Sequence, residues 1–270
     1  MRTNPVKTKL LSGQPVFGAF GWEFLVPGLP QIVKAAGAEF LLLDMEHAGT
    51  SYETIKEQVA LCRGIDVVPM VRVPTNQYHY ISRALDLGAM GIMAPMVGSA
   101  EEAEFVVSCT RYPPTGRRGA AFGFASDDYI GGSVTDKIKI ANERVLVMCL
   151  IETAVGIDNV DKIAAVPGVD VLWLGHFDLT NFLGIPAQFD HPKYVDAIQK
   201  LVAAARKHKK ILACMTAHDN WSREYWDKGF RLFAMGVDAH LLQGALRQGL
   251  TVLAGLNGAA KQRSKRQASR

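Results

Sequence analysis

Eight short apolar runs, each five to eight residues long, recur along the 270-residue chain and limit the folds that it can adopt. Amphipathic stretches with apolar residues at helical spacing lie between several of these runs, as at 52–64, 100–112 and 192–210. Strand and helix alternating eight times predict a single-domain (β/α)8 TIM barrel, because eight parallel strands can close on themselves. A doubly wound open sheet is the alternative. The expected strands are 16–20, 40–45, 67–73, 91–97, 145–152, 169–175, 211–216 and 232–238.

Two of the connections between the expected strands, 97–145 and 175–211, are longer than the others. Long connections in a compact domain are usually functional lids or contacts with a partner. We therefore expect these two segments to serve one of those roles.

The formal net charge of +4 depends on the C-terminal end of the chain. Residues 261–270 contain five basic and no acidic residues, and the rest of the chain has 25 basic and 26 acidic residues. We expect residues 1–256 to form the barrel domain and residues 257–270 to form a basic, disordered tail. A nucleic-acid-binding protein carries its basic surplus on the folded domain, so we expect no nucleic-acid partner.

Membrane and secretory signals are weak in this sequence. No apolar run approaches the roughly 20 residues that cross a bilayer, and the first residues lack the apolar stretch of a signal peptide. The four scattered cysteines contain no CxxC pair, so we expect reduced thiols in a cytoplasmic protein without a membrane partner. These cysteines are Cys62, Cys109, Cys149 and Cys214.

Polar and charged side chains follow the ends of seven of the eight apolar runs. Active sites of TIM barrels lie at the C-terminal ends of the strands, so we expect these residues to face one rim. In chain order they are Trp22 and Glu23; Asp44, Glu46 and His47; Arg72; Glu152; Gly175, His176 and Asp178; Thr216 and His218; and Asp238.

Glu152 and Asp178 follow consecutive strands. Neighbouring strands lie about 4.8 Å apart, so the two carboxylates can share one divalent ion, and hard oxygen ligands favour Mg²⁺ or Mn²⁺. Each carboxylate could instead cap the helix that follows it. The spacing leaves both interpretations open.

Arg72 and His47 are the other residues whose chemistry stands out. A buried guanidinium needs an anion, which Asp44 or Glu46 could provide structurally and a substrate carboxylate could provide functionally. His47 could be a surface histidine, or a general base beside two carboxylates.

Two absences narrow the chemistry. No lysine lies within an expected strand or at its C-terminal end, so a Schiff-base mechanism is not expected and carbanion chemistry would depend on a metal. The glycine-rich segment GRRGAAFG lacks the strand, GxxxxGK[ST] and helix order of a P-loop, and we expect no nucleotide cofactor.

The chain resembles the HpcH/HpaI family of class II, metal-dependent, pyruvate-utilising hydroxy-acid aldolases from about residue 14 to residue 255. The resemblance implies that Glu152 and Asp178 bind the metal (Mg²⁺, Mn²⁺ or Co²⁺), that Arg72 stabilises the enolate of pyruvate, and that His47 is the general base. It also implies that Asp86 orients His47, that Asp44 and Glu46 lie near the metal-bound waters, and that the protein is a homohexamer built as a trimer of dimers. The matching motifs are LLLDMEHA, VRVPTN, RALDLGAMGIMAPMV, TRYPPTGRRG, LIET and GVDVLWLGHFDLT.

Two departures from the family pattern affect the substrate pocket. Leu150 replaces the usual glutamine two residues before the metal-binding glutamate, and His176-Phe177 replaces the usual Pro-Ala before the metal-binding aspartate. His176 could contact the substrate or pack as a spacer beside Phe177. The residues expected to bind substrate are Trp22, Arg72, Leu150, Gly175, His176 and Phe177.

The resemblance implies an aldolase that cleaves 4-hydroxy-2-oxo acids to pyruvate, or another 2-oxo acid, and an aldehyde. Oxaloacetate decarboxylation, or acyl-CoA lyase chemistry through the same metal enolate, is the alternative. A non-enzymatic barrel that binds a small molecule is a third interpretation.

Overall fold

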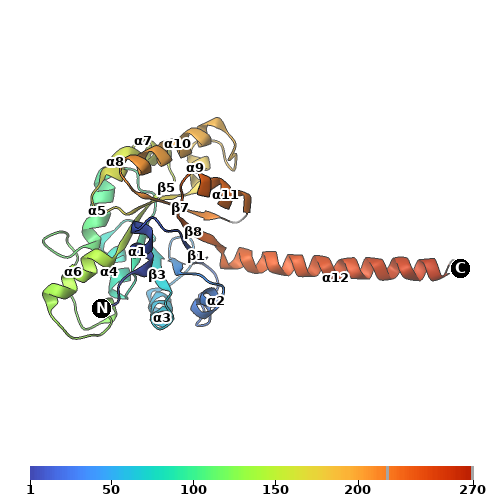
Figure 1. Ribbon diagram of the computed structural model, residues 1–270, viewed down its shortest axis with the longest axis horizontal. Coiled ribbons are helices and arrows are strands. Elements are labelled where there is room, and N and C mark those ends of the chain that lie inside the picture. Colours follow the sequence, from blue (N-terminus) through green and yellow to red (C-terminus); the bar gives the residue numbers. More distant parts are fainter. Residues whose placement is uncertain (217–218, 269–270) are drawn as a thin grey trace.

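A closed barrel of eight parallel strands forms the centre of the protein, in a computed structural model that describes residues 1–216 and 219–268 (Figure 1). Each strand pairs with its neighbours in chain order, and β8 pairs with β1 to close the barrel. The predicted TIM barrel is confirmed, and the open sheet is wrong. The strands are β1 (Val16–Gly21), β2 (Phe40–Asp44), β3 (Val68–Arg72), β4 (Gly91–Ala94), β5 (Leu146–Ile151), β6 (Val171–Leu174), β7 (Ile211–Thr216) and β8 (Leu232–Val237).

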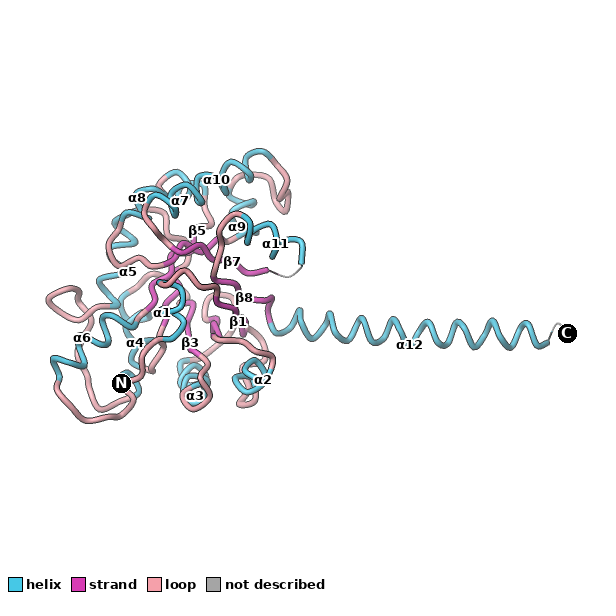
Figure 2. Tube along the Cα trace, viewed as in Figure 1, coloured by secondary structure: helices cyan, strands magenta, loops and turns pink. Residues whose placement is uncertain are grey.

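Most of the helices lie around this barrel (Figure 2). Several begin at a serine or threonine whose side chain accepts a backbone N–H of the first turn, as Ser51 does for α3. The helices are α1 (Pro5–Leu11), α2 (Leu29–Ala35), α3 (Tyr52–Cys62), α4 (Tyr78–Asp86), α5 (Ala100–Thr110), the 3₁₀ helix η1 (Ala125–Asp127), α6 (Val134–Arg144), α7 (Ala154–Asp158), α8 (Val160–Ala165), α9 (His176–Phe182), α10 (Pro192–Lys207), α11 (Asp219–Asp227) and α12 (Asp238–Ala268).

The strands are apolar on both faces because each face packs against a different layer. One buried cluster fills the inside of the barrel, and a second lies between the strands and the helices. Helix α1 contributes Val6 and Leu10 to the inner cluster. The Asn4 side chain donates to the carbonyl oxygens of Met90 and Arg144, which lie just before β4 and β5. Helix α1 therefore closes the N-terminal end of the barrel and leaves its C-terminal end for a site.

The two long connections contain helices of their own. The first holds α5, η1 and α6, and its loop is fixed by buried ion pairs such as Lys137–Asp127. The second holds α9 and α10. The second connection contributes residues to the cavity described below, and the first does not.

Helix α12 extends away from the barrel as a long projection (Figure 1). It continues past residue 256, where we expected the domain to end and a disordered tail to begin, and the domain boundary stays a prediction. Because α12 leaves the barrel, the outward side chains of the first and last strands are uncovered: Phe17 is 48% exposed and Met235 is 44% exposed. We call Phe17, Trp226 and Met235 the outer patch.

None of the helices in the described part of the chain combines the length and the apolar character that a membrane crossing requires.

Candidate active site

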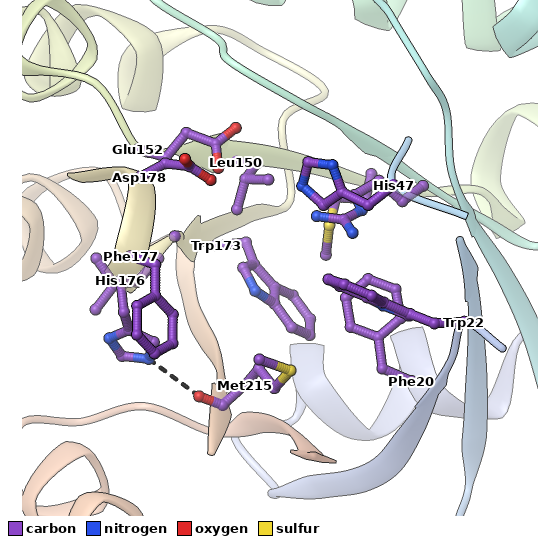
Figure 3. A pocket seen from close by; sticks show the side chains of 14 residues that line it. Phe20, Trp22, His47, Leu150, Glu152, Trp173, His176, Phe177, Asp178 and Met215 are labelled. Carbon is purple, nitrogen blue, oxygen red and sulfur yellow. Dashed lines mark hydrogen bonds between the residues drawn. The ribbon is translucent and has the colours of Figure 1, made fainter. Parts of the chain in front are cut away.

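A cavity of about 190 Å³ opens at the C-terminal ends of the strands. Its base is formed by inward side chains of the barrel, including Met93 and, as Figure 3 shows, Trp173 and Met215. Charged side chains lie above this apolar base. Nine residues that the sequence singled out line the cavity: Trp22, His47, Arg72, Leu150, Glu152, Gly175, His176, Phe177 and Asp178.

Arg72, the last residue of β3, is buried and partly neutralised by the protein itself. Its Nε donates to Asp44 Oδ1 at 2.6 Å, and its Nη1 lies 3.1 Å from Glu46 Oε2. The guanidinium carbon lies 4.8 Å and 5.0 Å from the ring centroids of Phe20 and Trp22. Nη2 is buried and has no hydrogen-bond partner among the described residues. The structural and the functional interpretation of Arg72 are therefore compatible, since Asp44 and Glu46 hold two nitrogens and the third has no acceptor among the described residues.

Asp44, the last residue of β2, holds the loop that carries the predicted base. Its carboxylate accepts the backbone N–H groups of Glu46, His47 and Ala48 at 2.9 to 3.1 Å, in addition to the hydrogen bond from Arg72. The side chain is completely buried. All its oxygen lone pairs are thus directed to protein donors, so Asp44 positions other groups.

Glu152 follows β5 and is fixed at one oxygen only. The backbone N–H of Met96 donates to Oε1 at 2.8 Å, and Met96 adopts the left-handed conformation with φ 55° to do so. On the other side, a Cβ on Gly175 would lie 2.6 Å from Glu152 Oε2, so only glycine leaves space for this carboxylate. Burial raises the pKa of Glu152 to about 7, and the negative charges of Glu46 and Asp178 act in the same direction.

These carboxylates fit a hard divalent cation. Burial also raises the pKa of Glu46, and the charges of Asp44 and Asp178 contribute to that increase. A cation would relieve this crowding of negative charge. In the described part of the chain, no three His, Cys, Asp or Glu side chains form a complete metal site. Glu152 and Asp178 would hold the ion, and water or substrate oxygens would complete its coordination, as Mg²⁺ commonly requires.

His47 lies at the edge of the cavity, with 46% of its side chain exposed. Its Nε2 is 3.8 Å from Glu46 Oε2, and its ring centroid is 5.4 Å from that of Trp22. The imidazole is therefore near the charged groups and open to a substrate.

Asp86 does not meet His47 within the chain. It is the last residue of α4, on the side where the chain enters β4, whereas His47 follows the end of β2. Its carboxylate pairs with Arg118 at 2.8 Å. The orienting contact that the family resemblance implied is absent between these residues in the chain described, and Asp44 holds the His47 backbone instead.

His176 is not placed to contact a substrate. Its Nδ1 lies 2.8 Å from Tyr194 Oη and its Nε2 lies 3.0 Å from the carbonyl oxygen of Met215. Burial lowers the pKa of the imidazole to about 4. Both nitrogens are used by the protein, so a substrate-binding role for His176 is not supported. Phe177, which is 55% exposed, presents its ring at the cavity instead.

Asp238, the first residue of α12, has a role that we did not predict. Its carboxylate accepts the backbone N–H groups of Trp22, Glu23 and Phe24 at 2.8 to 3.2 Å. It thereby holds the loop that places the Trp22 ring against Arg72 and His47.

Thr216 and Glu23, which also come from the strand ends, do not line the cavity. Thr216 is buried and accepts a hydrogen bond from Ser222, and Glu23 is not among the lining residues. His218 lies outside the described residues.

Comparison with known proteins agrees with this geometry. The family model described as HpcH/HpaI aldolase/citrate lyase matches residues 26–245. The chain belongs to this family. One family relative, the hydroxypyruvate/pyruvate aldolase of Roseovarius nubinhibens, is 33% identical over 92% of this chain and 96% of its own length. The 5-keto-4-deoxy-D-glucarate aldolase of Escherichia coli is 34% identical over 91% of this chain and 94% of its own.

A solved structure from the same family has the same architecture. The crystal structure of the HpcH/HpaI aldolase from Desulfitobacterium hafniense superposes with a TM-score of 0.88 at 29% identity. The match covers 93% of this chain and 97% of that one.

Proposed function

We propose that this protein is a divalent-metal-dependent aldolase that reversibly cleaves 4-hydroxy-2-oxo acids to pyruvate, or a related 2-oxo acid, and an aldehyde. One observation supports this most directly. Glu152, Asp178 and Arg72 line one cavity, and among the described residues no donor reaches Glu152 Oε2 or the Asp178 carboxylate and no acceptor reaches Arg72 Nη2. A cation site beside a free guanidinium nitrogen suits a substrate with adjacent keto and carboxylate oxygens.

The residues of the chain divide the remaining work. A bound Mg²⁺, Mn²⁺ or Co²⁺ would supply Lewis acidity toward the keto oxygen. Arg72 Nη2 donates to a substrate oxygen as negative charge develops, and its position is fixed in advance by Asp44 and Glu46. His47, or a water that it polarises, takes the proton of the 4-hydroxyl group during cleavage. Trp22 and Phe177 line the cavity and add apolar surface beside the charged groups.

The test measures two reactions with and without chelator. Solvent deuterium exchange into the methyl group of pyruvate reports proton removal alone, and cleavage of a 4-hydroxy-2-oxo acid reports the full reaction. EDTA should abolish both, and Mg²⁺, Mn²⁺ or Co²⁺ should restore them. Glu152→Gln, which keeps the shape and removes the charge, should be inactive, whereas Glu101→Gln at an exposed helix start should not.

Full activity in EDTA, or a borohydride-trapped adduct of pyruvate with a lysine, would contradict the proposal. Rates on oxaloacetate, measured in the same experiment, decide between aldol cleavage and decarboxylation.

We also propose a homo-oligomer, with a hexamer as the form that the family resemblance implies. Two apolar surfaces of one chain support this assembly. Helix α12 exposes Leu246, Leu250 and Leu253 by 56%, 62% and 61%, at helical spacing, and the outer patch is uncovered beside β1 and β8. A second copy could cover both surfaces, because each copy has one of each.

The expected cytoplasmic location is also a proposal. All four cysteines are free and buried, which is compatible with a reducing compartment.

A further inference from the structure

His176 connects four elements of the barrel through its two ring nitrogens. It lies in the first turn of α9, and Nε2 is 3.0 Å from the Met215 carbonyl oxygen in β7. Nδ1 is 2.8 Å from Tyr194 Oη in α10 and 3.4 Å from Tyr225 Oη in α11. The two tyrosine hydroxyls are 2.8 Å apart, so the three side chains form one buried hydrogen-bonded group.

The partners determine which nitrogen carries the proton. A carbonyl oxygen can only accept, so Nε2 of His176 donates to Met215. Nδ1 is then an acceptor, and the Tyr194 hydroxyl donates a hydrogen bond to it. Tyr225 in turn can donate to the Tyr194 oxygen. Every polar atom of the group is satisfied by one neutral tautomer, which leaves the imidazole no free position for a substrate.

Aromatic contacts restrict the ring further. The His176 ring centroid is 4.8 Å from that of Trp221 and 5.0 Å from that of Tyr225. The ring centroid of Phe189 lies 6.5 Å from that of His176 and 5.4 Å from that of Phe177, and the ring is edge-on to both. The first turn of α9 is therefore packed on an aromatic cluster in which Tyr225 is buried and Trp221 and Phe189 are partly buried.

Helix α9 needs this external support at its start. Its N-cap is Gly175, which makes no side-chain cap hydrogen bond, and the helix has only seven residues. Gly175 cannot be exchanged for a capping serine or aspartate, because any Cβ there would collide with Glu152. The residue that follows, His176, fixes the turn from the other side. Asp178 lies two residues further along the same turn.

We propose that His176 is a positioning residue, which holds the first turn of α9 so that Asp178 faces Glu152 and Phe177 faces the cavity. This inference rests on the proposed function, because it assumes that Asp178 binds the metal. The inference explains why this chain has His176 where the family usually has proline: the histidine supports the helix turn that carries Asp178.

The experiment measures Mn²⁺ binding without substrate, by the electron paramagnetic resonance signal of free Mn²⁺, together with the thermal midpoint. His176→Phe keeps a ring and removes both hydrogen bonds, and we expect at least tenfold weaker Mn²⁺ binding, as for other residues that orient metal ligands. His176→Gln keeps an N–H that can reach the Met215 carbonyl, so its loss should be smaller. The ratio of kcat/KM for two aldehydes should stay within twofold in His176→Gln.

Four outcomes are decisive. If folded His176→Phe binds Mn²⁺ within twofold of wild type, even with a lower thermal midpoint, His176 only packs and the inference is refuted. A changed aldehyde preference at unchanged Mn²⁺ affinity would assign it to recognition. If His176→Phe does not fold, Tyr194→Phe tests the same group and should weaken Mn²⁺ binding several-fold; unchanged binding there would overturn the inference. Wild-type protein that binds no Mn²⁺ would instead refute the proposed function.

Discussion

Replacing Arg72 with lysine is expected to abolish most activity although the positive charge is kept. The guanidinium has three nitrogens: Nε holds Asp44 at 2.6 Å, Nη1 contacts Glu46 at 3.1 Å, and Nη2 is buried and has no hydrogen-bond partner among the described residues. A lysine has one nitrogen at the end of a flexible chain and cannot reach all three positions. Since Asp44 is completely buried, the ammonium should pair with it and leave the substrate without its donor.

The magnitude follows from the contact that is lost. A preorganised donor to developing negative charge contributes about 2–4 kcal/mol, which is roughly a 30- to 1000-fold decrease in kcat/KM. Because Asp44 keeps three backbone N–H donors, the fold should survive the change. Mn²⁺ affinity should change little, because Glu152 and Asp178 are intact.

The assay compares kcat/KM for cleavage of a 4-hydroxy-2-oxo acid with deuterium exchange into pyruvate. Arg83→Lys is the matched control, since Arg83 is exposed on α4 and contacts only the Tyr52 ring among the interactions described. An Arg72→Lys enzyme within threefold of wild type in both assays would show that Nη2 has no part in the reaction and that Arg72 is structural.

Three further predictions concern the metal site, the assembly and acid stability. Gly175→Ala should weaken Mn²⁺ binding at least tenfold by displacing Glu152, whereas Gly131→Ala, with open space around it, should not. If Gly175→Ala binds Mn²⁺ as tightly as wild type, the steric argument is refuted. Leu250→Glu should lower the mass measured by light scattering, and an unchanged mass would exclude α12 from the interface. For Asp128, burial works to raise its pKa, but hydrogen bonds and charge from neighbouring arginines outweigh burial and lower it. The contribution of Asp128 to the unfolding free energy is therefore present above a pH of about 4 and lost as pH falls through the lower folded pKa. Asp128→Asn should be less stable than wild type in urea at pH 7, and the difference in unfolding free energy between the two proteins should narrow toward pH 3.

The barrel could be predicted from the sequence because its strands are local features. Strands β2 to β6 are buried on both faces by the same architecture, and the ends of all the expected strands agree with the structure within three residues. The direction of α12 could not be predicted. Its apolar residues have helical spacing whether the helix packs on its own barrel or extends from it, and the exposure of Phe17, Met235 and Leu250 in the structure distinguishes the two.

The sequence could predict which residues follow the strand ends and so lie at the rim of the site, but not the contacts that these residues make. That rule brought His47, Arg72 and Glu152 to one cavity, because parallel strands end on the same side. The partners of His176 could not be found in this way. Tyr194 lies 18 residues away and faces inward from a helix, and no local pattern shows that its hydroxyl is aimed at an imidazole.

The carboxylates at the strand ends differ in role according to the length of their side chains. Asp44 and Asp238 each accept three or more backbone N–H groups, and their short side chains suit hydrogen bonds to a nearby loop. Glu152 is one methylene longer, and it reaches the Met96 N–H beyond the neighbouring strand while Oε2 stays open to the cavity. An aspartate that ends a buried strand is therefore first a candidate to hold a loop, and a glutamate in that position is first a candidate to bind a ligand. The exception, Asp178, lies inside the first turn of α9, where its carboxylate accepts no hydrogen bond from the described residues and remains available to a cation.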